Sequence, residues 1–378
     1  MIMIKKKNIS LLLLFLLLNS CITQFVPQVT EEKELLVVQG LITDQNKIDT
    51  VKLSMSLPLG QASAAKPVSG CSVSITDDLG DLFNLTETTA GIYITPLSFR
   101  GETGRVYTLH VSTNSSSNNL HYESNPMELK PVPKIDSLYY EKINIQKPEG
   151  FFKGVDACQI NLDTYDPDNK CKYYRWNYTE TWQFRLLFEV PNQTCWITDK
   201  SHTIFIKSTV AFNEARIKSY PIIYISNATD RLKIKYSILV NQYSLNEEEY
   251  AYWEKIQNIA VQVGGLYDII PASVPSNIRC IEDPNEKVLG YFSVSAMTSK
   301  RIFIKDNFEG IVNKYANCIT DTVGTNNFPG LNVTAWILFA HLCSIPCVPF
   351  FEITTHKECS DCTLRGSLIK PDFWDENK

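Results

Sequence analysis

The sequence has few histidines, no cluster of basic residues beyond its first seven positions, and no later apolar run of transmembrane length. Its 5 histidines form no His-Glu-x-x-His or other recurrent metal-binding spacing. The Gly-x-Ser-x-Gly elbow, the phosphate-binding loop and the dinucleotide fingerprint are also missing, so no motif indicates nucleophilic catalysis or nucleotide binding. A formal net charge of −5 offers no electrostatic footprint for nucleic acid. We therefore expect no enzyme activity, no cofactor, no metal and no nucleic-acid partner.

The first twenty-one residues have the layout of a secretory signal. Lys5–Lys7 precede an unbroken apolar run, Leu11–Leu18, which is shorter than the about 20 residues that cross a bilayer. Leu18–Cys21 resembles the lipobox of bacterial lipoproteins, with Asn19 a mild departure. The resemblance implies that residues 1–20 are removed and that Cys21 is lipidated, which anchors the mature chain to a membrane. The alternative is an ordinary signal peptide, cut near Cys21, that leaves a soluble protein with a free thiol.

Short strands with alternating apolar and polar residues follow a tether over residues 21–34. Their spacing of roughly ten residues, with glycine and aspartate turns between them, predicts an immunoglobulin-like or transthyretin-like β-sandwich over residues 35–131. Pro131 and Pro133 stiffen the link to a larger β-rich domain over residues 135–378. The expected fold class is therefore mainly β.

One helix is predicted inside the second domain, at about residues 245–263. Ser244 and Glu247 have the spacing of a capping box, and Gly264 ends the run. Tyr252 and Ile256 fall on one apolar face, which we expect to lie on a sheet.

The sequence has 11 cysteines, ten of them besides Cys21. An even number in an exported chain suggests disulfide bonds, although spacing does not determine their pairing. Besides Cys71, the candidates are Cys158, Cys171, Cys195, Cys280, Cys318, Cys343, Cys347, Cys359 and Cys362. The last four have spacings near those of a zinc ribbon. Export and the apolar segment between the two pairs favour disulfides that fasten a cysteine-rich C-terminus.

An aromatic strand is the candidate ligand platform. Tyr174, Trp176, Tyr178 and Trp182 alternate along one face of it, and aromatic rings stack well on sugars. Aromatic residues in strands usually form the core, and this interpretation is favoured over a glycan or peptide site. A nearby aspartate-rich segment, Asp163–Asn169, is interpreted as a turn, with calcium coordination as the alternative.

Seven segments that span nearly the whole mature chain carry a family resemblance: Leu36–Asp44, Ile135–Glu141, Tyr174–Trp176, Tyr236–Leu245, Val288–Ser293, Cys359–Gly366 and Lys370–Trp374. Together they resemble the domain of unknown function 4249 family, whose members are lipoproteins of Bacteroidota-type bacteria.

The resemblance implies a lipid-anchored protein of the outer membrane, on its surface or periplasmic face, and supplies no catalytic residues. It also implies an accessory or binding subunit for a TonB-dependent outer-membrane barrel. A stand-alone glycan- or peptide-binding, adhesin-like lipoprotein is the alternative.

Overall fold

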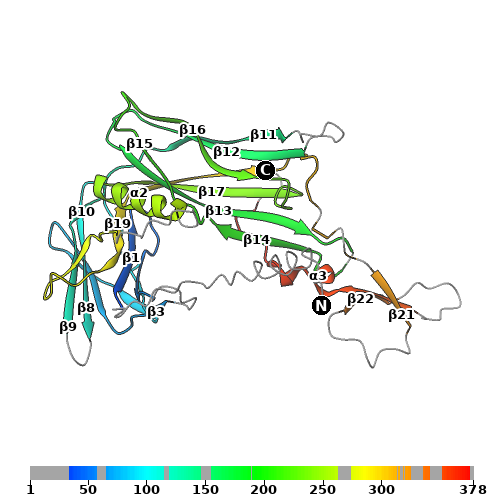
Figure 1. The fold of residues 1–378 in the computed structure, drawn as a ribbon, viewed down its shortest axis with the longest axis horizontal. Helices are drawn as coiled ribbons and strands as arrows, with labels where there is room; N and C mark the ends of the chain where they lie inside the picture. The colour runs from blue at the N-terminus through cyan, green and yellow to red at the C-terminus, as the bar shows by residue number, and fades with distance from the viewer. Residues whose placement is uncertain are drawn as a thin grey trace, which may run out of the picture.

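The computed structural model describes residues 34–57, 65–114, 119–145, 155–188, 190–262, 274–312, 314–315, 318, 320–324, 335–340 and 351–374. These residues form a mainly β protein with two sandwiches and one long helix, α2 (Glu247–Gln262), beside the place where the sandwiches meet (Figure 1). The expected fold class is confirmed. Cys21 and the tether up to residue 33 lie outside the described residues.

The first sandwich consists of two six-stranded sheets. One sheet has the order β19-β1-β2-β7-β6, with β3 beside β2, and the other has the order β18-β9-β8-β4-β5, with β10 beside β8. Their strands are β1 (Leu36–Thr43), β2 (Thr50–Met55), β3 (Lys66–Pro67), β4 (Ser72–Asp77), β5 (Leu82–Asn84), β6 (Thr86–Thr89), β7 (Ile92–Ile94), β8 (Val106–Asn114), β9 (Asn119–Ser124), β10 (Met127–Glu128), β18 (Ile278–Cys280) and β19 (Leu289–Ser295). Val38 and Leu53 from one sheet pack in a single core with Ile75 and Leu109 from the other.

Two strands of this sandwich come from late in the chain. β19 pairs in parallel with β1, and β18 pairs antiparallel with β9. The first sandwich therefore extends beyond residues 35–131, because residues 278–295 complete both of its sheets. After Ala296 the chain enters β20 (Met297–Ile304), which belongs to the second sandwich. The consecutive strands β19 and β20 therefore connect the first sandwich directly to the second.

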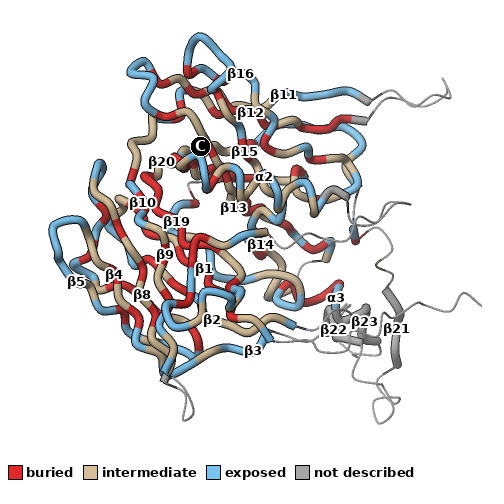
Figure 2. Tube along the Cα trace, turned by 60° about the vertical axis from the view of Figure 1, so that its left-hand side comes forward, coloured by how far each residue is buried: buried red, intermediate tan, exposed pale blue. Residues whose placement is uncertain are grey.

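The second sandwich packs a three-stranded sheet, β11-β12-β16, on a sheet of order β14-β13-β17-β20, in which β15 also pairs with β13. The remaining strands are β11 (Ile135–Ile145), β12 (Val155–Asp166), β13 (Tyr173–Arg185), β14 (Thr194–Lys200), β15 (Phe205–Ser208), β16 (Ala215–Ile225) and β17 (Lys235–Ser244). Ile160 and Leu162 from one sheet share a core with Ile238 and Val240 from the other. Figure 2 shows buried residues concentrated between the sheets of each sandwich.

Helix α2 confirms the helix predicted at residues 245–263, but its first turn differs from the prediction. Ser244 is the last residue of β17, and its hydroxyl donates to the carbonyl of Lys130. The helix begins at Glu247, and Tyr250 N donates to Asn246 O, so Asn246 occupies the capping position. Within the described part of the chain, no helix is long and apolar enough to cross a membrane.

The C-terminal region contains a fifth sheet of order β21-β23-β22, a single helical turn α3 (Lys357–Ser360) and a 3₁₀ turn (Cys362–Leu364). Its strands are β21 (Thr320–Gly324), β22 (Ala335–Ala340) and β23 (Phe351–His356). Disulfide bonds join Cys195 of β14 to Cys362, and Cys318 to Cys359. Four of the nine candidate cysteines are thus confirmed as disulfide-bonded, and Cys359 and Cys362 are not thiolate ligands of zinc.

Three other candidates are corrected by the structure, because Cys158, Cys171 and Cys280 carry free thiols, as Cys71 does. The three are buried in the cores of the sandwiches, where they pack as small apolar residues. Burial raises the pKa of the Cys158 and Cys171 thiols to about 12, so both stay protonated near neutral pH. Cys343 and Cys347 lie outside the described residues.

Candidate functional site

The aromatic strand is part of the core. Trp176 is 1% exposed, donates from Nε1 to Gln242 Oε1 at 2.8 Å, and stacks on Tyr174 and Tyr220 with ring centroids 5.7 and 4.5 Å away. Tyr174 and Trp182 are also buried in this core, and Tyr178 packs against it. The candidate ligand platform of Tyr174, Trp176, Tyr178 and Trp182 is therefore corrected, and the favoured interpretation, that these residues belong to the core, is confirmed.

The aspartate-rich segment is a turn. Both carboxylate oxygens of Asp166 accept backbone N–H groups, from Asp168, Lys170 and Cys171. Asn169 has a φ of 56°, which suits asparagine at a tight turn. Among the described residues, no group of three or more histidine, cysteine, aspartate or glutamate side chains is placed to hold a metal ion.

A cleft forms where α2 faces the first sandwich, and the outer face of the β19-β1-β2 sheet is its floor. The register places Tyr291, Gln39 and Lys52 in one row across these three strands. Ser293 and Leu41 lie in the next row. Since β1 alternates buried and accessible residues, the accessible side of this strand faces the cleft.

The wall of the cleft is a stripe along α2. Tyr252, Trp253 and Ile256 line the cavity, and Glu249 lies one turn earlier on the same side of the helix. These residues are spaced at intervals of three and four, which is why one helix face can present them together. The cavity between wall and floor has a volume of about 480 Å³. This volume lies within the range of small-molecule sites.

One charged residue of β13 closes the cleft. Arg175 points away from the core that holds its neighbours on the strand, and its guanidinium lies 4.3 Å from the ring centroid of Trp253 and 5.1 Å from that of Tyr243. No hydrogen bond or ion pair of the Arg175 side chain is formed with the described residues, and its Nε is buried.

Behind Trp253 lies a buried carboxyl group. Glu249 is 0% exposed, and its Oε1 accepts from Trp253 Nε1 at 3.1 Å, which orients the indole ring. Burial raises the pKa of Glu249, and the charge of Arg175 together with hydrogen bonding by Ser293 and Trp253 opposes that rise. Glu249 and Arg175 therefore both contact Trp253.

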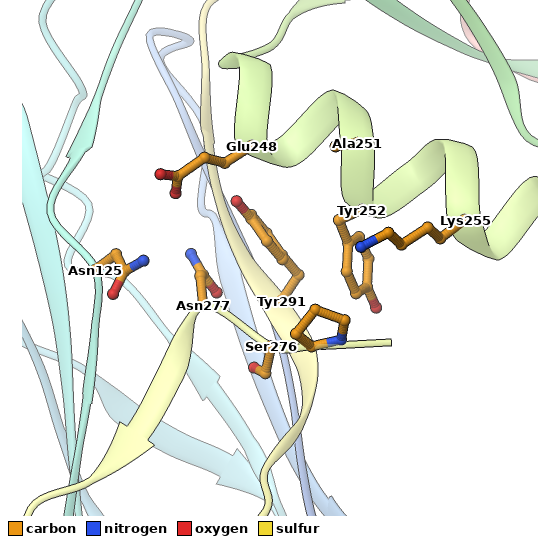
Figure 3. Close-up of a pocket in the computed structure, with 9 residues that line it drawn as sticks. Asn125, Glu248, Ala251, Tyr252, Lys255, Ser276, Asn277 and Tyr291 are labelled. Atoms are coloured by element: carbon orange, nitrogen blue, oxygen red, sulfur yellow. The ribbon is translucent and has the colours of Figure 1, made fainter. Parts of the chain in front are cut away.

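A second cavity of about 280 Å³ adjoins the first. Tyr252 and Tyr291 line both cavities, and their ring centroids are 4.6 Å apart. Figure 3 shows the two rings side by side, with Lys255 of α2 extending toward Tyr252 and with Glu248 on the side of Tyr291. Tyr291 is 6% exposed, and its hydroxyl has no hydrogen-bond partner among the described residues. The tyrosine pair thus separates two adjoining spaces, each with polar and aromatic walls.

Sequence reasoning did not bring these residues together. The helix stripe was recognisable from its periodicity, whereas Arg175 was missed; the available signal is that it is the one charged residue among Tyr173–Tyr178. No local signal placed either of them against Lys52 or Tyr291, because these residues are far apart in the chain and meet only through the parallel pairing of β19 with β1.

A family profile described as domain of unknown function (DUF4249) matches residues 22–301. Because the match covers most of the chain, the protein belongs to this family. The matched segment ends at residue 301, within β20, and contains all the residues that line the two cavities. No curated protein matches the chain.

Proposed function

We propose that this protein is a lipid-anchored binding protein of the bacterial outer membrane that acts as an accessory subunit of a TonB-dependent receptor. The observation that carries the binding function is the cleft between α2 and the first sandwich. It combines a volume of about 480 Å³ with aromatic rings and a positioned arginine. Pockets of this kind are the default sites for ligands.

The anchoring rests on the start of the sequence. The short apolar run ends at Cys21, the position at which bacterial lipoproteins are cut and lipidated. We expect Cys21→Ser to release the protein from the membrane fraction, because two or three acyl chains hold a protein far more firmly than one. Fractionation of cells that produce each form, followed by immunoblotting, tests this. Equal membrane retention of both forms would contradict lipid anchoring.

The partnership is tested by affinity purification of the tagged full-length protein from its native envelope, with mass spectrometry of what co-purifies. A stoichiometric outer-membrane barrel is the expected result. The Cys21→Ser form is the control, since it passes through the same purification without the proposed anchor.

Purification of the anchored protein alone would support the second candidate, a stand-alone glycan- or peptide-binding lipoprotein. The aromatic and cationic lining of the cleft favours this candidate as well.

A further inference from the structure

The larger cavity has a positively charged lining. Lys52 lines it from the exposed part of the floor, and Arg175 lines it from β13. Among the described residues that line this cavity there is no carboxylate, and Glu249 lies outside it. Charge complementarity therefore favours an anionic ligand over a cationic one.

Arg175 is held in place for such a ligand. Its guanidinium group lies against two aromatic rings, those of Trp253 and Tyr243, which restrict its movement. A guanidinium presents several N–H donors in a planar fork that matches a carboxylate in a bidentate arrangement. Nε of Arg175 is buried, so the two terminal nitrogens are the ones that can donate to an incoming carboxylate.

The groups around Arg175 match a ligand rich in hydroxyls. Gln39, Thr50 and Ser293 bring an amide and two hydroxyl groups to the floor. These groups both donate and accept hydrogen bonds, as ligand hydroxyls do.

The central strand of the floor does not favour a peptide strand as the ligand, because β1 is paired with β19 on one side and with β2 on the other. β19 is the outer strand of the sheet, and the side-chain amide of Asn277 already bonds both the N–H and the carbonyl of Phe292 on it.

Arg175 lies on the Trp253 ring and Tyr291 lies against the Tyr252 ring, and the half-buried remainder of both rings lines the cavity. This remaining aromatic surface is where the apolar face of a sugar ring can pack.

We propose that this cleft binds an acidic saccharide, with the carboxylate of a uronic acid ring on Arg175 and Lys52 and the ring itself against Tyr252 and Trp253. The proposal rests on the binding function inferred above and names the chemical class of its ligand.

Isothermal titration of the detergent-solubilised, full-length mature protein tests it. The probes are 4-linked uronic acid disaccharides of the gluco, galacto and manno series, each paired with the neutral disaccharide of the same stereochemistry. At least one acidic disaccharide is expected to bind about tenfold or more tightly than its neutral counterpart, since a charge-assisted bidentate contact is lost in the neutral one. Phenylacetate serves as a carboxylate that lacks hydroxyls.

Two variants locate the contact. Arg175→Met is expected to abolish the preference for the acidic disaccharide, while Lys52→Met, a change at an exposed position, is expected to weaken binding by about threefold. The matched control is Arg216→Met, because Arg216 also stacks on an aromatic ring, Tyr165, at 3.7 Å but lies on β16. If Arg175→Met fails to fold, as judged by circular dichroism, Lys52→Met still tests the site.

Three results would overturn the proposal. They are binding of no acidic disaccharide tighter than about 1 mM, equal binding of acidic and neutral forms, and binding of phenylacetate in place of the sugars. Co-purification of a barrel without saccharide binding would overturn this proposal and leave the accessory function standing. Saccharide binding by a protein that purifies without a barrel would support this proposal and contradict the accessory function.

Discussion

Replacing Gly290 with alanine tests whether the close parallel approach of β19 to β1 holds the floor of the cleft. Gly290 lies opposite Val38 and has a φ of 88°, a conformation that residues with a Cβ rarely adopt. A Cβ at this position would lie 2.0 Å from Val38 O and 2.8 Å from Val38 C. Both atoms belong to the backbone, so the two strands would have to move apart.

The magnitude follows from comparison with Gly80, which has the same φ of 88° and no atom within 4 Å of the position that a Cβ would take. Gly80→Ala carries the conformational cost alone, about 1 kcal/mol. Gly290→Ala adds the displacement of packed backbone, about 1–3 kcal/mol. We therefore expect Gly290→Ala to lower the free energy of unfolding by about 2–4 kcal/mol.

Urea unfolding followed by tryptophan fluorescence measures both variants under the same conditions. A larger loss for Gly290→Ala than for Gly80→Ala is the expected result. Equal losses would refute the reasoning, because they would mean that the contact between Gly290 and Val38 contributes nothing beyond the local backbone conformation.

Three further changes test the core, the C-terminal fastening and a buried carboxyl. Trp176→Ala should cost about 3–5 kcal/mol in urea unfolding, as for a large core side chain; a loss below about 1 kcal/mol would revive a surface role for the ring. Replacing Cys195 and Cys362 together by serine opens a loop with a sequence separation of 167, which should lower the free energy of unfolding by about 5 kcal/mol. Peptide mapping without reduction should show this disulfide in the parent protein. Burial raises the pKa of Asp49 from 3.8 to about 6, so its folded form holds the proton more tightly than the unfolded chain does. The stability contributed by this bound proton is complete below about pH 4 and is lost as the pH rises through about 6. Between pH 4 and pH 7, the free energy of unfolding of the parent protein should therefore fall by about 1–3 kcal/mol relative to that of Asp49→Asn. Parallel pH profiles of the two proteins would contradict this.

Much of the architecture was predictable because it rests on local patterns. Period-two alternation marks strands wherever one face is buried, and the first sandwich and the strand Tyr173–Arg185 follow from it. The acidic first turn and the apolar stripe marked helix α2 in the same way. Sequence segments spread over the chain also led to the correct family.

The aromatic strand shows what a local sequence pattern cannot predict, namely which face of a strand becomes buried. Alternation indicated that Tyr174 and Trp176 share a face and that Arg175 lies on the other, but it did not say which face meets a second sheet. Packing against the β11-β12-β16 sheet buried the aromatic face and left Arg175 for the cleft.

Contacts between distant segments were decided by the tertiary structure alone. Cys195 pairs with Cys362 because β14 and the C-terminal 3₁₀ turn meet in space, and no spacing along the chain encodes that meeting. The cleft depends in the same way on the return of β19 to β1. The sequence by itself determined which residues become strands and helix, since secondary structure depends on neighbours within a few positions. Tertiary packing decided which cysteines pair and which side chains face the cleft, because both depend on segments brought together from across the chain.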